Sequence, residues 1–486
     1  MSILESETQP LTSSSTNDQT AIAELRAAFA AQRAAFHTDR YPSVAERKAR
    51  VGKLIEMLLS HREPISTALS ADFGSHPVPA SDLIEVLGPV GRAKYVLENL
   101  EDWMRPSARE IDPAMMGTAQ AYIHSQPKGL IGNIVPWNFP FDLSVGPMIE
   151  MLAAGNRVIV KPSEYTPASA ELLQEMVEAT FDPTLVYVAV GGLDLARAIA
   201  DLPWDHLLYT GSPNVGRQIM QAAARNLTPV TLELGGKCPA VLTPGSVNAT
   251  NVQSIIGTKT VKNGQMCISV DYCLVPRAEV DTFVKLSLDF MRAAAANYSQ
   301  SPDCTGIISL RHLDRLADML QEARDRKSLV VELEANGRTD RATRRMPISL
   351  VIDPAPDLRI MQEEIFGPIL PVVPYDDVDD AVAMINAGER PLGLYVFGDA
   401  PASTDQILSQ IVSGGAAVNT CAIQGALPSL AFGGVGMSGI GRHHGIEGFR
   451  EFSNNRGVVV RGAGDHFDAF FAPYAKAAAI VKSVLG

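Results

Sequence analysis

Short apolar runs alternate with helical stretches from about residue 128 onward, and this alternation limits the possible folds more than any other feature of the chain. The runs at 130–135, 157–160, 185–190 and 206–209 hold four to six residues each, and each ends at turn residues. Helical stretches such as 168–179 lie between them. Strands of this length that alternate with helices form βαβ units, whose strands pair in parallel and are buried on both faces. The pattern therefore predicts an α/β fold with a parallel sheet.

A second alternating region follows Cys267. It combines apolar runs at 272–275, 348–351 and 370–373 with a helical stretch around 278–296. A chain of 486 residues is too long for one hydrophobic core, because single cores stop growing at about 250–300 residues. We therefore expect two or three domains, and the second α/β domain carries Cys267.

The remaining segments have simpler patterns. Residues 21–37 and 44–70 place apolar side chains at helical spacing and predict helices. Residues 1–20 are rich in Ser, Thr, Gln and Asp, which is typical of a flexible lead-in. Residues 118–127 and about 456–461 are predicted to form extended ribbons.

Composition excludes several classes of function. The net charge of −13 argues against nucleic acid and anionic membranes as partners. No run of 18 apolar residues is present, so a transmembrane segment is not predicted. The N-terminus carries Glu5 and Glu7 where a signal peptide would carry basic residues.

The cysteine pattern favours free thiols. Five cysteines, an odd number, contain no C-x-x-C pair, which suits a reducing cytoplasm better than disulfides or a zinc site. The pair His443–His444 also lacks metal-ligand spacing to a carboxylate, so we predict no metal site.

Three residues supply the parts of an acyl-enzyme mechanism. Cys267 follows a Gly-containing turn, and a thiol attacks as thiolate in an electropositive or dipole-rich setting. Glu233, at the end of an apolar run and before two glycines, is a candidate general base toward water. Asn138, between two prolines, has an amide suited to hold an oxyanion. The alternatives are a buried structural cysteine, a solvated surface carboxylate and a turn-capping asparagine.

Five motifs carry a resemblance to a known family. PWNFP (136–140), LELGGK (232–237), GQMCI (264–268), EEIFGP (363–368) and FGGVGMSGIG (432–441) follow one another in the chain. Their order and spacing resemble those of the NAD(P)-dependent aldehyde dehydrogenase superfamily over about residues 20–465. The chain is thus similar to enzymes that oxidise an aldehyde to the carboxylic acid through a cysteine thioester.

The resemblance implies a domain organisation. It places a Rossmann-type cofactor-binding domain at 21–116 and 128–235, and an α/β catalytic domain at 236–435. A small β oligomerisation element at 117–127 and 456–470 joins subunits, after a flexible N-terminus at 1–20.

The resemblance also implies roles for the three candidate residues. Cys267 is the nucleophile, Glu233 activates water, and Asn138 donates to the oxyanion beside the Cys267 amide. Branches that pass the acyl group to coenzyme A or phosphate generally lack the glutamate, so Glu233 favours hydrolysis. An acyl-transferring relative and a non-catalytic protein on the same scaffold remain as alternatives.

The cofactor site is predicted partly from residues and partly from the resemblance. Gly211 and Ser212 follow a strand and open a helix, which is a suitable place for a pyrophosphate, although only two glycines of G-x-G-x-x-G are present. Lys161 and Glu164 follow another strand and, by resemblance, bind the adenosine ribose, although a solvated loop is the simpler interpretation. An acidic residue there is the usual solution for NAD, so we expect NAD to be preferred and NADP tolerated. The expected cofactor-binding residues are Pro136, Trp137, Lys161, Glu164, Gly211, Ser212, Gly216, Leu234, Glu364 and Phe366.

The segments 264–272 and 444–453 look most like the class 3 branch, and within it like coniferyl-aldehyde-dehydrogenase-like members. This similarity implies a homodimer, and the cysteine pattern favours a cytoplasmic location. The similarity also implies a small-molecule substrate, either an aromatic aldehyde such as coniferyl aldehyde or a medium-to-long aliphatic aldehyde.

Overall fold

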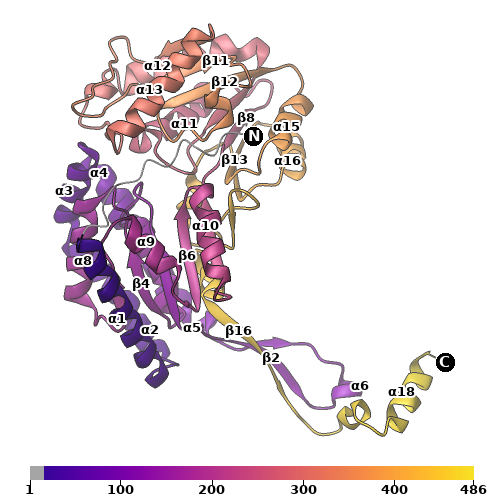
Figure 1. Ribbon diagram of the computed structural model, residues 1–486. Coiled ribbons are helices and arrows are strands. Elements are labelled where there is room, and N and C mark those ends of the chain that lie inside the picture. The colour runs from indigo at the N-terminus through magenta and orange to yellow at the C-terminus, as the bar shows by residue number, and fades with distance from the viewer. Residues whose placement is uncertain (1–15, 486) are drawn as a thin grey trace.

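Three β-sheets organise the computed structural model, which describes residues 16–485 (Figure 1). A six-stranded sheet and a seven-stranded sheet form two α/β bodies, and a three-stranded sheet forms an arm that projects from them. The α/β fold expected from the alternating runs is confirmed. The expected flexible lead-in lies outside the described residues up to residue 15, and residues 16–20 are already helical.

The six-stranded sheet has the order β15-β7-β6-β3-β4-β5. All neighbouring pairs from β7 to β5 are parallel, and only the short β15 is antiparallel. The chain therefore starts in the middle at β3, runs outward to β5, and returns to the other side of β3 through β6 and β7. With β3 to β7 counted in chain order, this is the 3-2-1-4-5 part of the Rossmann strand order. Its strands are β3 (Leu130–Ile134), β4 (Arg157–Lys161), β5 (Val186–Val188), β6 (His206–Gly211), β7 (Val230–Leu234) and β15 (Gly439–Ile440).

Helices cover both faces of this sheet because its strands are apolar on both sides. Leu130 and Ile159 contact one core, whereas Ile131, Val158 and Val160 contact the other, as the alternation of side chains along a strand requires. The first core is closed by α1 (Thr16–Thr38), α9 (Leu193–Ala200) and α10 (Pro213–Ala224). The second is closed by α2 (Val44–Ser60), α3 (Arg62–Phe73), α5 (Gly88–Trp103), α7 (Asp142–Ala153), α8 (Pro167–Thr180) and α17 (Gly445–Glu451).

The seven-stranded sheet has the order β10-β11-β12-β9-β8-β13-β14 and is parallel except at β10. Its strands are β8 (Pro239–Leu242), β9 (Tyr272–Pro276), β10 (Leu329–Glu332), β11 (Ser349–Ile352), β12 (Ile369–Tyr375), β13 (Gly393–Phe397) and β14 (Gly415–Val418). Its helices are α11 (Ala249–Thr260), α12 (Val280–Ala294), α13 (Leu310–Asp325), α14 (Arg359–Gln362), α15 (Val378–Ala387) and α16 (Pro401–Gln410).

The arm consists of β1 (Ser107–Arg109), β2 (Gln120–Pro127) and β16 (Ser453–Val460), all antiparallel. Helices α6 (Pro113–Met116) and α18 (Ala475–Leu485) lie at its far end (Figure 1). Strand β16 pairs with β2 over the whole length of both strands, so the arm joins segments that are more than 300 residues apart. No helix within residues 16–485 has the length and apolar character needed to cross a membrane.

Two local features differ from the expectation. The helix expected over 44–70 is broken at His61 into α2 and α3, and His61 ends one helix and begins the next with ψ of 17°. Short α4 (Val78–Ala80) leads into η1 (Ser81–Leu87), which is a π-helix, a form that is rare and frequent at functional sites. Residues 16–485 also contain five short 3₁₀ helices: η2 (Val261–Gly264), η3 (Arg277–Glu279), η4 (Tyr298–Gln300), η5 (Ile423–Gly425) and η6 (Phe467–Phe470).

Candidate active site

Most of the predicted site residues lie just past the carboxyl ends of the parallel strands of the six-stranded sheet. Asn138 follows β3, Lys161 ends β4, Gly211 ends β6, and Glu233 is the next-to-last residue of β7. Ligands of open α/β sheets bind at this edge, beside the point where the strand order reverses. The topology thus brings together residues that are far apart in the sequence.

Cys267 lies in the connection between α11 and β9, after a turn of unusual conformation. Lys262, Asn263 and Gly264 all have positive φ, at 47°, 54° and 75°. For residues other than glycine this conformation costs about 1–2 kcal/mol each. A Cβ on Gly264 would lie 2.3 Å from the carbonyl oxygen of Gly367, so only glycine fits there.

Side chains within the turn hold it against the seven-stranded body. The Asn263 amide donates to the carbonyl of Met346 at 3.2 Å. The Gln265 amide donates to the carbonyl of Gly306 at 3.0 Å and accepts from the Ile308 N–H at 2.9 Å. These contacts fix the backbone immediately before Cys267.

Lys262 connects this turn to the segment that carries Asn138. Its ammonium forms a fully buried ion pair with Glu85 of the π-helix and donates to the backbone carbonyl of Asn138 at 2.7 Å. It also lies 4.4 Å from the centre of the Phe139 ring. The second oxygen of Glu85 accepts from the Phe141 N–H at 3.0 Å. One buried ion pair therefore sets the Asn138 segment against the cysteine turn.

The charges around Cys267 differ from the expected electropositive setting. Burial, followed by the nearby carboxylates Glu364 and Glu233, raises the pKa of the thiol to about 12. The backbone N–H groups of Cys267 and Ile268 act in the opposite direction, as expected for a dipole-rich turn. The side chains nearest the thiol are thus acidic instead of basic, because the strand-end edge brings two carboxyl groups to it.

Glu233 is buried and has no hydrogen-bond partner among residues 16–485. It is 3% exposed, and neither of its carboxylate oxygens is satisfied. Burial raises its pKa well above the usual range, with Glu451 adding to the shift and Arg442 opposing it. A buried, unpaired carboxyl with a raised pKa is a functional-site candidate rather than a structural one.

Several residues expected to bind the dinucleotide lie along the strand-end edge of the six-stranded sheet. The Lys161 ammonium lies 2.8 Å from a Glu164 oxygen, so the two predicted ribose-binding residues are neighbours. Ser212 caps α10 by accepting from the Val215 N–H at 3.4 Å. A Cβ on Gly216 would lie 2.7 Å from Leu234, so glycine lets α10 pack closely on β7.

Glu364 and Phe366 lie in the loop between α14 and β12 of the seven-stranded sheet. They approach the strand-end edge beside Gly235 and Trp137. A Cβ on Gly235 would lie 2.1 Å from a Glu364 oxygen, so the glycine allows the carboxylate to approach the backbone. Burial and the charge of Asp271 raise the pKa of Glu364 to about 8. The Phe366 and Trp137 rings meet edge to face with centroids 5.2 Å apart. Pro136, the remaining predicted residue, is partly buried and lies two residues after the end of β3.

Sequence reasoning missed Glu85 and Lys262, and it considered His443 only as a metal ligand. Nothing in the sequence marks Glu85, which lies in a helical segment about 180 residues before its partner. Lys262 stands next to the glycine turn, but its burial follows only from the packing. Within the described part of the chain, no cluster of three or more His, Cys, Asp or Glu side chains could bind a metal ion.

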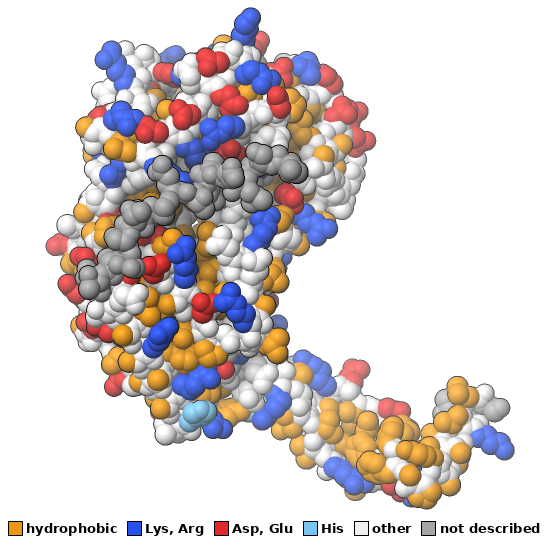
Figure 2. All heavy atoms as spheres, viewed as in Figure 1, with side chains coloured by type: hydrophobic (Ala, Val, Ile, Leu, Met, Phe, Trp, Pro, Cys, Tyr) orange, Lys and Arg blue, Asp and Glu red, His pale blue; other side chains and the backbone are white. Residues whose placement is uncertain are grey.

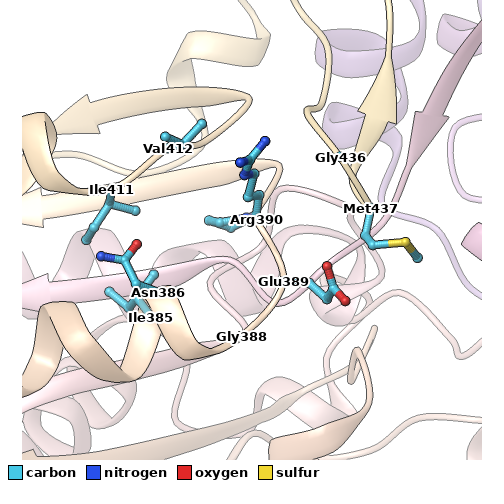
Figure 3. Close-up of a pocket in the computed structure, with 10 residues that line it drawn as sticks. Ile385, Asn386, Gly388, Glu389, Arg390, Ile411, Val412, Gly436 and Met437 are labelled. Carbon is cyan, nitrogen blue, oxygen red and sulfur yellow. The ribbon is translucent and has the colours of Figure 1, made fainter.

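A pocket of about 470 Å³ lies apart from the predicted site residues, between α15, the Ile411–Val412 segment and the loop at Met437 (Figure 3). Glu389, Arg390 and Met437 are among the residues that line it, and none of the predicted site residues does so.

Comparison with known proteins is consistent with this geometry. The sequence profile described as "Aldehyde dehydrogenase family" matches residues 8–458. A protein of Caulobacter vibrioides named "Probable coniferyl aldehyde dehydrogenase" is 41% identical, covering 88% of this chain and 89% of its own. The structure of Staphylococcus aureus AldH in a substrate-bound state superposes with a TM-score of 0.89 and 31% identity, covering 95% of this chain and 99% of that one. Mycobacterium tuberculosis aldehyde dehydrogenase complexed with NAD+ has a TM-score of 0.80 and 27% identity, covering 91% and 90%.

We expect Lys262→Met to destabilise the protein strongly, because it leaves the Glu85 carboxylate buried without its counter-ion. Removing one partner of a buried ion pair costs about 3–5 kcal/mol of unfolding free energy, which urea denaturation would measure. Arg277→Met is the matched control, because it breaks the exposed pair with Asp376 and should leave the urea midpoint nearly unchanged. Equal midpoints for Lys262→Met and the unmodified protein would contradict the bridging role.

Proposed function

Because this chain belongs to the aldehyde dehydrogenase family, we propose that it works through a thioester on Cys267, hydrolysed with the help of Glu233. The overall reaction is the oxidation of an aldehyde to its carboxylic acid with NAD as the oxidant. The observation that best supports the assignment of roles is the meeting of a thiol and a buried, unpaired carboxyl at one strand-end edge.

Cys267 is the nucleophile in this proposal. Its turn is held rigidly by Gln265 and Lys262, so the thiol is presented at a fixed position. The thiol gives its proton to solvent water, and the resulting thiolate attacks the carbonyl carbon to give a hemithioacetal oxyanion. The Asn138 amide and the Cys267 N–H are the donors for that oxyanion, and one such donor contributes about 10²–10³ in rate.

The residues of the dinucleotide edge fit NAD. The crowded glycines at 216 and 235 let Leu234 and the Glu364 carboxylate pack against the backbone of this edge, and the N-terminus of α10 favours a pyrophosphate. Lys161 and Glu164 would hold the adenosine ribose, and Glu364 the nicotinamide ribose. When bound, NAD+ supplies the hydride acceptor and a positive charge.

Glu233 completes the reaction by hydrolysis. As a carboxylate it takes a proton from water, the resulting hydroxide attacks the thioester carbonyl, and the C–S bond breaks to release the acid and the Cys267 thiolate. Because burial raises the pKa of Glu233, the fraction in the basic form increases with pH. The hydrolytic step therefore accelerates as pH rises through that raised pKa.

We propose an apolar aldehyde as substrate, either aromatic, such as coniferyl aldehyde, or medium-to-long aliphatic. Cys267 packs beside an apolar cluster that includes Ile268, with Phe432 against it. Leu427 and Leu430, in the loop leading to Phe432, are 42% and 45% exposed. The name of the Caulobacter relative supports the aromatic candidate.

We also propose a cytoplasmic homodimer. Apolar side chains gather on the projecting arm (Figure 2), and Val459, Phe470 and Phe471 are 59–65% exposed. A surface of this kind marks a protein contact, and a second copy of the chain is the partner that the family resemblance implies. All five cysteines are free thiols, as a reducing compartment would keep them.

Cys267→Ala should lower kcat for aldehyde oxidation by more than about 10³-fold, because no other thiol can form the thioester. NAD binding, measured by titration calorimetry, should be retained. Cys273→Ala is the control: Cys273 is fully buried in β9, and its removal should change kcat by only a small factor. Substantial turnover by Cys267→Ala would refute the assignment.

Glu233→Gln should turn the steady production of NADH into a burst, because the thioester forms but is hydrolysed about 10²–10⁴-fold more slowly. Stopped-flow absorbance with and without coenzyme A would measure the burst and any acyl transfer. The increase of rate with pH should also disappear. Glu171→Gln, which removes an exposed carboxylate of α8 away from the site, is the control. A wild-type steady-state rate in Glu233→Gln would eliminate the base role.

Glu164→Gln should shift the ratio of kcat/KM values toward NADP. A carboxylate at the adenosine ribose repels a 2′-phosphate, while the adjacent Lys161 partly offsets that repulsion. Because the Glu164 side chain is 39% exposed, solvent weakens the effect, and we expect a shift of about two- to fivefold. Glu171→Gln, an exposed carboxylate on α8, should leave the ratio unchanged. An unmodified protein that uses NADP much better than NAD would contradict the proposed orientation of Glu164.

A further inference from the structure

Two buried polar side chains without hydrogen-bond partners face each other at the base of the site. Glu233 is 3% and His443 1% exposed, and within residues 16–485 neither a carboxylate oxygen of the one nor a ring nitrogen of the other is satisfied. Oε1 of Glu233 lies 4.0 Å from Nε2 of His443. An unsatisfied buried polar group costs about 1–3 kcal/mol, so both side chains favour closing this gap. Catalytic hydrogen bonds are often long in unliganded structures and shorten in complexes.

The backbone holds His443 at this position. Strand β15 pairs with β7 so that Gly439 lies opposite Glu233, and His443 follows a few residues later. The N–H and carbonyl of His443 both pair with Phe432, each at 2.8 Å. Its ring contacts the rings of Phe432 and His444, with centroids 5.6 and 4.5 Å away. The imidazole is therefore fixed, and a change in the Glu233 side chain of about 1 Å is enough to form the bond.

We propose that neutral His443 is a positioning residue for Glu233, donating a hydrogen bond from Nε2 to Oε1 and so orienting the carboxylate that activates water. This inference rests on the proposed role of Glu233 as the base. The carboxylate is an acceptor only, so it selects the tautomer of His443 with its proton on Nε2. The hydrogen bond stabilises the charged form of Glu233 and opposes the effect of burial.

The charges around His443 favour positioning over proton uptake. Burial and the guanidinium of Arg92 lower the pKa of His443 to about 3, so the imidazole stays neutral while the enzyme works. The groups that face it are Arg92 of α5, the neighbouring His444 and, beside Gly448, Glu150 of α7. The groups that face Glu233 are Arg442, Glu451 and the Cys267 thiol. Since an imidazole with this pKa cannot store the proton of Glu233, its contribution is the hydrogen bond.

The test is the pH dependence of acyl-enzyme hydrolysis in His443→Phe, His443→Gln and the control His444→Phe. Hydrolysis is followed after rapid mixing with aldehyde and NAD, as loss of the protein-bound acyl group. His443→Phe removes the donor, so the midpoint of the acidic limb should rise by about one pH unit, which is about a tenfold lower rate below the midpoint. The burst of NADH, which precedes hydrolysis, should keep its rate. His443→Gln retains a donor and should restore the midpoint, and His444→Phe should leave it unchanged.

The outcomes separate this inference from the proposed function. A His443→Phe profile that superposes on that of the unmodified protein overturns the inference, and so does His443→Gln behaving like His443→Phe. If Glu233→Gln hydrolyses its acyl-enzyme at the normal rate, the base role itself fails. Should His443→Phe not fold, His443→Asn replaces it, because its shorter amide does not reach Glu233. Equal midpoints for the Asn and Gln variants would then overturn the inference.

Discussion

The arrangement of the site depends on the contacts that the buried Lys262 ammonium makes. It pairs with Glu85 from the π-helix and with the backbone carbonyl of Asn138, and it lies at the start of the left-handed turn that leads to Cys267. A turn with two non-glycine residues at positive φ persists only where surrounding contacts over-determine it. The ion pair supplies one such contact and also fixes the position of the Asn138 segment relative to the Cys267 turn.

The electrostatics of the site follow from its place between two sheets. Glu233 lies near the end of a strand of one sheet, and Cys267 precedes a strand of the other. The Glu364 carboxylate approaches the same region because Gly235 has no side chain to exclude it. The thiol therefore sits among carboxylates, and burial raises the pKa values of all three groups. Such a site is unfavourable for the thiolate by itself, and this agrees with a reaction that uses a positively charged cofactor.

In the proposed mechanism, the arrangement of Glu233 and His443 keeps the base available. A buried carboxylate saturated with donors would have a depressed pKa and would be a poor base. Here neither carboxylate oxygen has a hydrogen-bond partner among residues 16–485, and the imidazole 4.0 Å away is held by backbone pairing instead of by the carboxylate itself. In the proposed mechanism the carboxylate can therefore move toward water at the thioester.

The sequence by itself determined the α/β architecture, because strand-length apolar runs separated by helical stretches form buried parallel sheets. It also predicted Cys267, Glu233 and Asn138 as candidate catalytic residues, since each stands in a motif with its own local constraint. Tertiary structure alone decided which residues meet. The ion pair of Lys262 with Glu85 and the approach of His443 to Glu233 bring together segments about 180 and 210 residues apart. Burial, which turns an ordinary lysine or histidine into a partner for a carboxylate, depends on packing that no local pattern encodes.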